Sequence, residues 1–598
     1  MSEIKKRNEM DPKYTWATED MYVSDEAFQK DFEVLKEMAK EGLTFKGKLG
    51  ESSDILLDYF KKSDAVSLKI ENLFEYASRK SDENTKNPTY QAMIGSVYSY
   101  FVEFESEMAF VTPELLAISD ETLEKFFAEN EDLKLYRRAI NEVRRRRAHI
   151  LSDKEERILA AANDMAQGPE KIYSMFSDAD LTFPDVKNEK GENASLTQGT
   201  FISLLESNNR DVRKNTFETY YKVMDNFKNT AASTYDAQVK SLMFNAKMRN
   251  YNSTLEAALD GTDVPVAVYK NLVDAVHKNM HHMHKYVKLR KKLMKVDELH
   301  MYDLYTSVVP NVDTKVDFET AKKNVYDAVA PLGKDYQDIL KTGFDNRWID
   351  VYENEGKRSG AYSAGAKVHP YVLLNFHDSL DNEFTLAHEM GHALHSYHSN
   401  KYQPTVYSDY RIFVAEVAST FNEALLMEHL LETTTDKMER AALINHFLDQ
   451  FKGTIYRQTM FAEFEMITNE MAERGEALTA EALSNVYYDL NKQYFGEDMI
   501  IDKDIALEWA RIPHFYYNFY VFQYATGYSA AIALSRKVLD EGEEAVKNYK
   551  KFLSGGSSAS PIDLLKIAGV DMSSPEPINQ ALSLFGKLID ELDELLSE

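Results

Sequence analysis

A short apolar stretch of the chain contains two histidines and a glutamate at the spacing of a metal site. His388, Glu389 and His392 lie in the sequence FTLAHEMGHALH (384–395). On a helix, residues four apart lie on one face and one turn apart, so both imidazoles can reach one ion. Glu389 is rotated by about 100° from His388 and can act on a zinc-activated water beside the ion. Gly391 leaves room for a neighbouring element to approach the helix closely. Two histidines and a glutamate are unfavourable in an apolar helix unless they are paired or ligated, which favours a metal site over a chance match.

A catalytic zinc site needs a third protein ligand and keeps a fourth position open for water. The chain contains no cysteine that could be this ligand. His395 and His398 are nearby, but a straight helix does not easily bring three such positions around one tetrahedral ion. We favour Glu416, which lies between apolar residues and far enough along the chain for an antiparallel return. Glu423, two turns later on the same face, could hydrogen-bond a ligating histidine; a surface or helix-capping carboxylate is the alternative.

A second group of polar side chains recurs at spacings of three and four between residues 511 and 528. The group consists of one imidazole and four phenols, from His514, Tyr517, Tyr520, Tyr524 and Tyr528. This spacing predicts one face of a helix. Periodicity alone favours an aromatic core face, but buried phenols and imidazoles need hydrogen-bond partners. In a zinc peptidase, such side chains could instead donate hydrogen bonds to the oxyanion that forms when water attacks the carbonyl.

Long helices are expected to position these groups. The chain has only 23 glycines and 14 prolines in 598 residues, which favours long helices and few tight turns. Helical periodicity begins after a capping serine at residue 24 and recurs over 54–79 and 88–110.

The helical pattern is interrupted twice. Residues 181–198 predict a small hairpin, and residues 346–378 predict a sheet of two or three strands directly before the helix of His388. We place a domain boundary near residue 200. The expected domains are a helical N-terminal domain, 1–200, which ends in the hairpin, and a catalytic domain, 201–598.

Composition and charge exclude several classes of function. Hydrophobic residues make up 44% and charged residues 28% of the chain, which argues against disorder. The net charge of −28 disfavours general nucleic-acid binding, because an acidic chain repels phosphate backbones. The N-terminal sequence lacks the apolar core of a secretory signal, and no stretch approaches 18 consecutive apolar residues. We therefore expect a soluble cytoplasmic protein without nucleic-acid or membrane partners.

Three sequence blocks resemble the oligoendopeptidase F branch of the thimet-oligopeptidase family of zinc metallopeptidases. They are RSGAYS and LLNF followed by TLAHEMGHALH (358–395), EVASTFNE (416–423) and RIPHFYYNFYVFQYATGY (511–528). Their order and spacing agree with the family, and the helical content fits along nearly the whole chain. The resemblance implies a mainly α, multi-helix, zincin-type metallopeptidase with a small β-sheet beside the active site. It also implies a deep substrate channel that admits short peptides and excludes folded proteins.

The resemblance further implies roles for individual residues. One Zn²⁺ per chain would be held by His388, His392 and Glu416, with Glu389 as the catalytic base. Three other residues match family positions that stabilise the oxyanion; they are His514, Tyr520 and Tyr524. Tyr528 is a candidate substrate-binding residue, offset by one residue from a tyrosine of more distant members. Tyr517 is interpreted as a packing residue.

Two further residues are candidates for binding the substrate backbone. Gly360 and Ala361 resemble an exposed strand beside the site, against which a peptide could add as a further strand. A plain connection between elements explains these two residues equally well.

These observations predict a zinc-dependent endopeptidase that hydrolyses internal bonds of short, unstructured oligopeptides. Glu389 would be the general base and then the general acid. One alternative is an exopeptidase on the same scaffold, like a dipeptidyl carboxypeptidase or an aminopeptidase, which would need a dedicated group for a substrate terminus. Another alternative is a non-catalytic helical peptide-binding protein. The intact metal-site residues argue against this second alternative.

Overall fold

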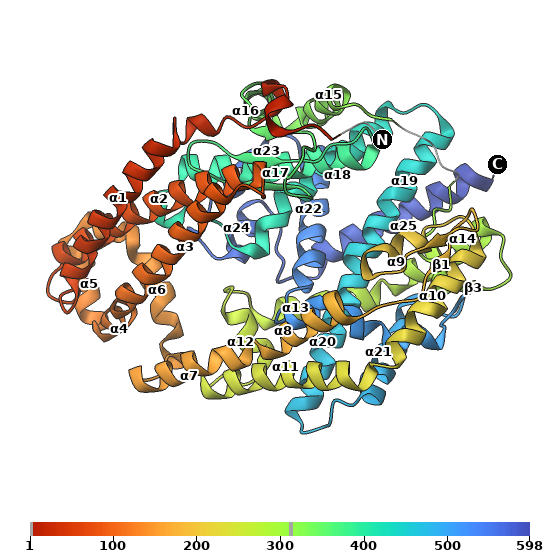
Figure 1. Cartoon of the computed structure of the whole chain (residues 1–598), viewed down its shortest axis with the longest axis horizontal. Helices are drawn as coiled ribbons and strands as arrows, with labels where there is room; N and C mark the ends of the chain where they lie inside the picture. Colours follow the sequence, from red (N-terminus) through yellow and green to blue (C-terminus); the bar gives the residue numbers. More distant parts are fainter. Residues whose placement is uncertain (1–3, 310–314, 598) are drawn as a thin grey trace. The chain divides into compact units, whose positions relative to one another are not determined.

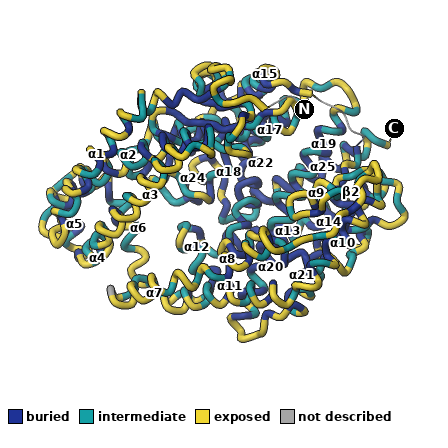
Figure 2. The backbone as a smooth tube through the Cα atoms, in the orientation of Figure 1, coloured by how far each residue is buried: buried dark blue, intermediate teal, exposed yellow. Residues whose placement is uncertain are grey.

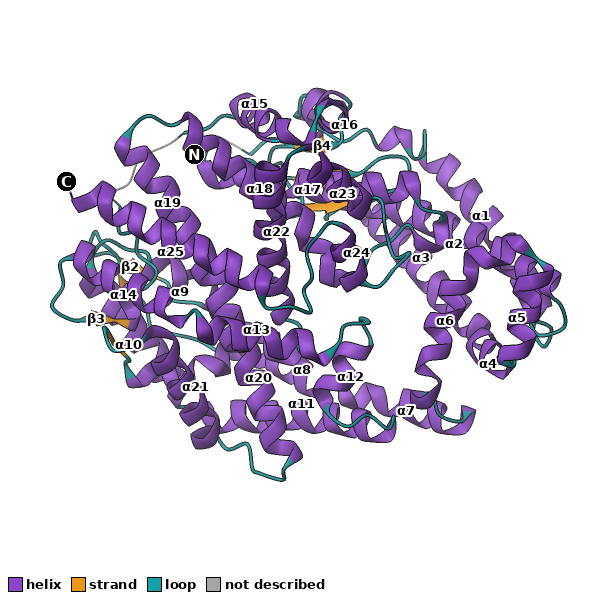
Figure 3. Cartoon of the chain, turned by 180° about the vertical axis from the view of Figure 1, so that it is seen from behind, coloured by secondary structure: helices purple, strands orange, loops and turns teal. Residues whose placement is uncertain are grey.

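The structure is a computed structural model that describes residues 4–309 and 315–597 (Figure 1). Helices dominate, and the described strands are short and few (Figure 3). This confirms the predicted mainly α class. No helix in the described ranges combines the length and the apolar character that a bilayer span requires.

The chain folds into two compact units, and each unit is assembled from separated segments. Unit 1 comprises Met1–Ala148, Thr314–His429 and Leu534–Gly569, and unit 2 comprises His149–Asp313, Leu430–Ala533 and Val570–Glu598. Neither unit ends near residue 200. The predicted domains 1–200 and 201–598 therefore have other boundaries than these two units, and that division stays a prediction.

The N-terminal part of unit 1 is a set of packed antiparallel helices. Its first three long helices are α1 (Asp25–Gly42), α2 (Ser53–Glu83) and α3 (Pro88–Glu107), and α2 packs against both others (Figure 1). The hydroxyl of Ser24 accepts a hydrogen bond from the backbone N–H of Ala27 at 3.3 Å, which is the predicted helix cap. Phe28, Leu35 and Leu73 belong to the core between these helices.

The predicted sheet before the histidine helix is present in unit 1. It contains β4 (Ile349–Asp350), β5 (Tyr362–Ala364) and β6 (Tyr371–Leu373) in the order β4-β6-β5, and β6 runs parallel to β4 and antiparallel to β5. The indole N–H of Trp16 donates to the carbonyl of Val372 at 2.8 Å and fastens the N-terminal segment to the central strand. The predicted hairpin is also present, in unit 2, as β1 (Val186–Lys187) paired antiparallel with β2 (Asn193–Ala194).

The predicted single helix through residues 514–528 is wrong. Two 3₁₀ helices, η13 (Lys503–Arg511) and η14 (Pro513–Tyr516), precede a turn, and α22 begins only at Phe522 and runs to Glu541. Pro513 lacks a backbone donor and keeps the preceding residue extended. Asn518 and Phe519 then adopt left-handed backbone angles, with φ of 51° and 58°, which a continuous right-handed helix cannot contain.

Unit 2 contains a buried ion-pair network directly before this turn. The carboxylate of Glu508, only 2% exposed, accepts hydrogen bonds from Arg457 at 2.7 Å, from Arg511 at 2.8 Å and from the Tyr487 hydroxyl at 2.6 Å. Burial alone would raise the pKa of Glu508, but the charges of Arg457 and Arg511 outweigh burial and lower this pKa to about 2. The network therefore stabilises the fold most fully at pH values above the carboxyl's unfolded pKa.

We expect Glu508→Gln to lower the midpoint of urea unfolding markedly. The amide leaves two buried guanidinium groups without a counter-charge, and breaking a buried pair in this way typically costs about 3–5 kcal/mol. In the wild type, this stabilisation should be lost as the pH falls from about 4.5 towards 2, because the folded-state pKa is depressed. The matched control is Glu476→Gln, which removes an exposed partner of Arg474 and should shift the midpoint little. Equal midpoints for the two variants would contradict a stabilising role of the network.

Candidate active site

Two helices of unit 1 bring the three predicted metal ligands together. His388 and His392 lie on α17 (Leu380–Tyr402), which is buried over most of its length (Figure 2), and Glu416 lies on α18 (Ile412–Thr433). The Nε2 atoms of both histidines lie 3.3 Å from Glu416 Oε2. The two imidazole centroids are 4.8 Å apart, with the ring planes at 83°. Within the described residues, these three side chains are the group whose donor atoms could hold one ion.

The spacing of the donors fits zinc. Zinc–nitrogen and zinc–oxygen bonds of about 2.0–2.1 Å at tetrahedral angles separate neighbouring ligand atoms by about 3.3–3.4 Å. Both nitrogen–oxygen separations in this group are 3.3 Å. Two imidazoles and one carboxylate also match the donor set of catalytic zinc sites, which leave one position for water or substrate.

The close approach of α17 and α18 depends on Gly391. A Cβ atom at this position would lie 2.5 Å from the carbonyl oxygen of Ala418 and 2.6 Å from the Cα of Ser419. Only glycine allows the backbones to approach this closely, as the sequence predicted for this position. The amide of Asn422 also donates to the carbonyl of Ala387 at 3.4 Å and links the two helices beside the donor group.

Glu423 and Ser419 of α18 hydrogen-bond two of the predicted ligands. The carboxylate of Glu423 accepts a hydrogen bond from His388 Nδ1, which leaves Nε2 of that ring for a metal. The Ser419 hydroxyl donates to Glu416 Oε2 at 3.0 Å. Burial alone would raise the pKa of Glu416, but hydrogen bonds from His388 and His392 outweigh burial and lower it well below its usual value. Glu416 is therefore an ionised carboxylate, the form that a metal binds.

Glu389 lies in the protein interior beside the donor group. Its residue is 6% exposed, and its Oε2 atom is buried without a hydrogen-bond partner in the described part of the chain. Burial raises the pKa of Glu389, and the nearby His388 and His392 act in the opposite direction. A buried carboxylate with an uncommitted oxygen is a suitable general base.

The alternative histidine ligands are engaged elsewhere. The ring of His395 stacks on Tyr410, with centroids 3.8 Å apart and planes at 5°. Its burial lowers the pKa of His395 to about 3, so the imidazole is neutral. The Nδ1 atom of His398 donates to the carbonyl of Leu394 at 2.8 Å. The sequence showed no sign of the stacking role of Tyr410, because that contact joins an interhelical loop to the helix.

Gly360 and Ala361 directly precede β5, a strand at the edge of the sheet. The side-chain amide of Asn375 donates to the carbonyls of Gly360, at 2.9 Å, and Arg358, at 3.0 Å. Gly360 has a φ of 83°, so a side chain there would be strained. The edge position leaves one side of β5 without a neighbouring strand in the described sheet.

The aromatic candidates lie in unit 2 and form a cluster although they do not share a helix. The ring centroids of His514 and Tyr524 are 6.1 Å apart, and those of Tyr520 and Tyr524 are 5.2 Å apart. Burial lowers the pKa of His514, so its imidazole is neutral near pH 7. Tyr528, 5% exposed, instead packs edge-on against Phe451. Tyr517 lies next to His514, with ring centroids 5.5 Å apart, but it is 45% exposed, so its interpretation as a packing residue is wrong.

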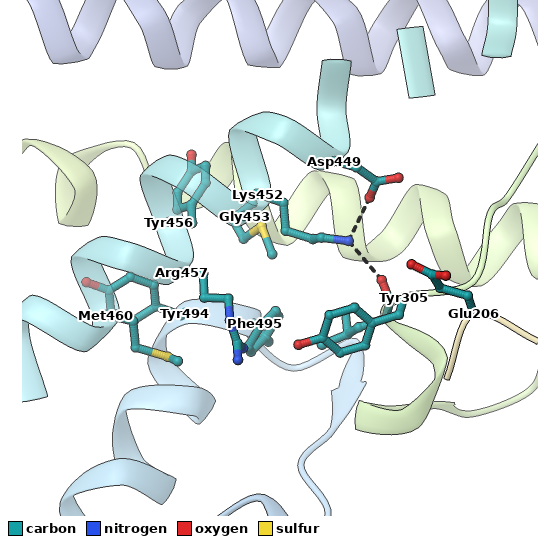
Figure 4. A pocket seen from close by; sticks show the side chains of 12 residues that line it. Glu206, Tyr305, Asp449, Lys452, Gly453, Tyr456, Arg457, Met460, Tyr494 and Phe495 are labelled. Carbon is teal, nitrogen blue, oxygen red and sulfur yellow. Dashed lines mark hydrogen bonds and ion pairs between the residues drawn. The ribbon is translucent and has the colours of Figure 1, made fainter. Parts of the chain in front are cut away.

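Unit 2 also contains a partly open pocket of about 230 Å³ with a mostly apolar wall (Figure 4). The ammonium of Lys452 reaches Asp449 at 2.6 Å and the carbonyl of Leu304 at 2.8 Å. Arg457 is paired with Glu508 at 2.7 Å. Both cations of the lining therefore already have carboxylate partners.

Comparison with known proteins gives one consistent result. The family model for Peptidase family M3 matches residues 203–584, and the model for Oligopeptidase F matches residues 114–183. The chain is 48% identical to oligopeptidase PepF of Bacillus subtilis, over 100% of this chain and 89% of that protein. It is 41% identical to an oligoendopeptidase F homolog of Lactococcus lactis, over 99% of both chains. The structure resembles that of oligoendopeptidase-F from Enterococcus faecium with a TM-score of 0.74 and 38% identity, over 96% of this chain and 99% of that one.

Proposed function

The chain belongs to peptidase family M3, and from this premise we propose that it is a zinc-dependent endopeptidase that cleaves internal bonds of short, unstructured oligopeptides. The observation that carries the proposal is the group of His388, His392 and Glu416, with the buried carboxylate of Glu389 beside it. The names of the similar proteins, which are oligopeptidases, support an oligopeptide substrate. The cytoplasmic location and the absence of nucleic-acid and membrane partners stay predictions.

The proposed mechanism assigns a task to each side chain of the centre. His388, His392 and Glu416 would hold one Zn²⁺, and Glu423 would fix the ring of His388. When bound, zinc supplies a Lewis acid that polarises a carbonyl and lowers the pKa of water. Glu389 accepts the proton of the attacking water and then delivers it to the amine that leaves.

We assign the oxyanion donors to the aromatic cluster of unit 2. The neutral imidazole of His514 offers one N–H, and the phenols of Tyr520 and Tyr524 each offer one O–H. Donors of this kind stabilise the negative charge that develops on the scissile carbonyl oxygen. A substrate role for Tyr528 stays a prediction, although its ring packs in the core of unit 2.

The substrate backbone is proposed to bind beside β5. An extended peptide can add to a free strand edge through backbone hydrogen bonds, which suits peptides of many sequences. Gly360 and Ala361 lie at the start of this edge and would offer their backbone groups to the peptide.

A size limit on substrates is expected. About 350 residues precede the first sequence block, which begins at residue 358, and in the described part of that stretch no second donor group for a metal is present. We propose that this helical mass covers the site and forms the predicted deep channel, because packed helices must bury their apolar faces against another element. Cleavage rates should therefore fall sharply beyond short peptides.

The size limit is tested with peptides of increasing length that are blocked at both termini, and with casein as an unfolded protein. Product masses identify the cleaved bonds, and cleavage inside doubly blocked peptides separates an endopeptidase from either exopeptidase. Efficient digestion of casein from the first minutes would contradict the channel and leave an endopeptidase with an open cleft.

A further inference from the structure

The turn between η14 and α22 has a backbone conformation that needs support from its surroundings. Asn518 and Phe519 are consecutive non-glycine residues with φ of 51° and 58°. A bulky residue in the left-handed region is uncommon, and such strain persists only where neighbouring groups fix it. Phe519 is also 2% exposed, so its ring is buried while its backbone is strained.

Glu465 of α20 (Arg457–Glu473) supplies a direct contact to this strained backbone. Its Oε1 atom accepts a hydrogen bond from the backbone N–H of Phe519 at 2.6 Å. The residue is 1% exposed, and its Oε2 atom has no hydrogen-bond partner within the described residues. Burial raises the pKa of Glu465 to about 8, against the opposing effect of the Phe519 N–H, so the carboxyl is neutral near pH 7.

The contact lies at the centre of the segment that presents the aromatic cluster. Phe515 and Phe519 of this segment are buried, whereas His514 and Tyr520 are partly exposed. The amide of Gln238 holds the same segment through the carbonyl of Tyr516 at 3.1 Å. The N–H that Glu465 holds belongs to the peptide between Asn518 and Phe519. Tyr520 follows Phe519 directly, so its position relative to this fixed peptide depends on the left-handed backbone angles of Phe519.

We propose that Glu465 is a positioning residue that fixes the left-handed turn at Phe519 and thereby aims the Tyr520 hydroxyl at the oxyanion. This inference rests on the proposed function of Tyr520. A positioning role of Glu465 differs from a general stabilising role, because positioning affects the transition state alone. Interactions made only in the transition state change kcat and leave KM unaffected.

The test compares three replacements of Glu465 in the full-length zinc-loaded protein with a doubly blocked peptide. Glu465→Leu removes the acceptor at similar volume, and we expect kcat to fall about 100-fold, because a small misplacement of a catalytic group can have this effect. KM and zinc content should be unchanged.

Glu465→Gln should keep near-wild-type kcat, because the amide is neutral, as the carboxyl is, and retains the accepting oxygen. Glu465→Asp retracts the carboxyl by one methylene and tests the same contact if the leucine variant does not fold.

Two further variants separate this inference from its premise. Tyr520→Phe alone should lower kcat by about 10²–10³-fold, and in that background Glu465→Leu should have little further effect, since both act on one donor. Glu463→Gln, on the same helix, alters a buried carboxyl that contacts His277 and Tyr494 and should leave kcat unchanged.

Wild-type kcat in Glu465→Leu, or full additivity with Tyr520→Phe, would overturn the inference and leave the oxyanion role of Tyr520 intact. Wild-type kcat in Tyr520→Phe would overturn the oxyanion role of Tyr520 together with the inference about Glu465. It would not bear on the proposed zinc ligands.

Discussion

Replacing Glu389 by glutamine should abolish turnover while zinc stays bound. The amide is nearly isosteric with the carboxyl but cannot accept the proton of the attacking water. We expect kcat to fall at least about a thousandfold, within the range that removal of a general base causes. Because Oε2 of Glu389 has no hydrogen-bond partner in the described residues, the replacement should disturb its surroundings little. The measurement is kcat on an internally quenched peptide, with zinc determined by elemental analysis.

The matched control for this variant is Glu383→Gln on the same helix. Glu383 is 1% exposed and accepts a hydrogen bond from the amide of Asn324 at 2.7 Å, so it is equally buried but lies outside the donor group. The control should keep most of its activity. Near-normal activity of Glu389→Gln with full zinc would remove Glu389 from its proposed role.

Glu416→Ala should lose the metal together with the activity. His388 and His392 alone bind zinc weakly, and the third ligand completes the geometry of the site. The carboxylate of Glu416 lies 3.3 Å from both imidazole nitrogens, so its removal takes away the group that is common to both contacts. Zinc per chain after dialysis and cleavage of the quenched peptide are the two measurements.

Glu423→Gln provides a graded comparison for this loss. It alters only the hydrogen bond that orients His388, and changes in such outer partners typically weaken metal binding about 10–100-fold. The variant should therefore regain activity when zinc is added, whereas Glu416→Ala should not. Full zinc occupancy in Glu416→Ala would place the third ligand elsewhere, and His395 would be the next residue to replace.

The donor group of the proposed metal centre could be predicted from the sequence because its geometry is largely local. Helical periodicity alone places His388 and His392 one above the other, and the apolar surroundings of Glu416 indicated a buried carboxylate on a returning helix. The role of Gly391 was also predictable, since a glycine between His388 and His392 leaves room for a neighbouring helix to approach closely. The small sheet before α17 was predictable because aromatic and β-branched runs alternated with turn residues.

The aromatic segment could not be predicted in the same way, because its conformation depends on a tertiary contact. The spacings of His514, Tyr520 and Tyr524 fit one helix, but the turn at Phe519 is fixed by Glu465, which is distant in sequence. The compact units were equally inaccessible, since each is assembled from three separated segments. Local periodicity carries no information about which distant segments pack together.

The central claim is that one zinc ion, held by the donor group of unit 1, makes this chain an endopeptidase. The most direct test is to remove the metal with a chelator and to titrate zinc back while following cleavage of an internally quenched peptide blocked at both termini. We predict no cleavage without metal, a linear rise with added zinc and saturation at one equivalent per chain. Cleavage at full rate in the metal-free protein, or no cleavage of the doubly blocked peptide at one equivalent of bound zinc, would contradict the account.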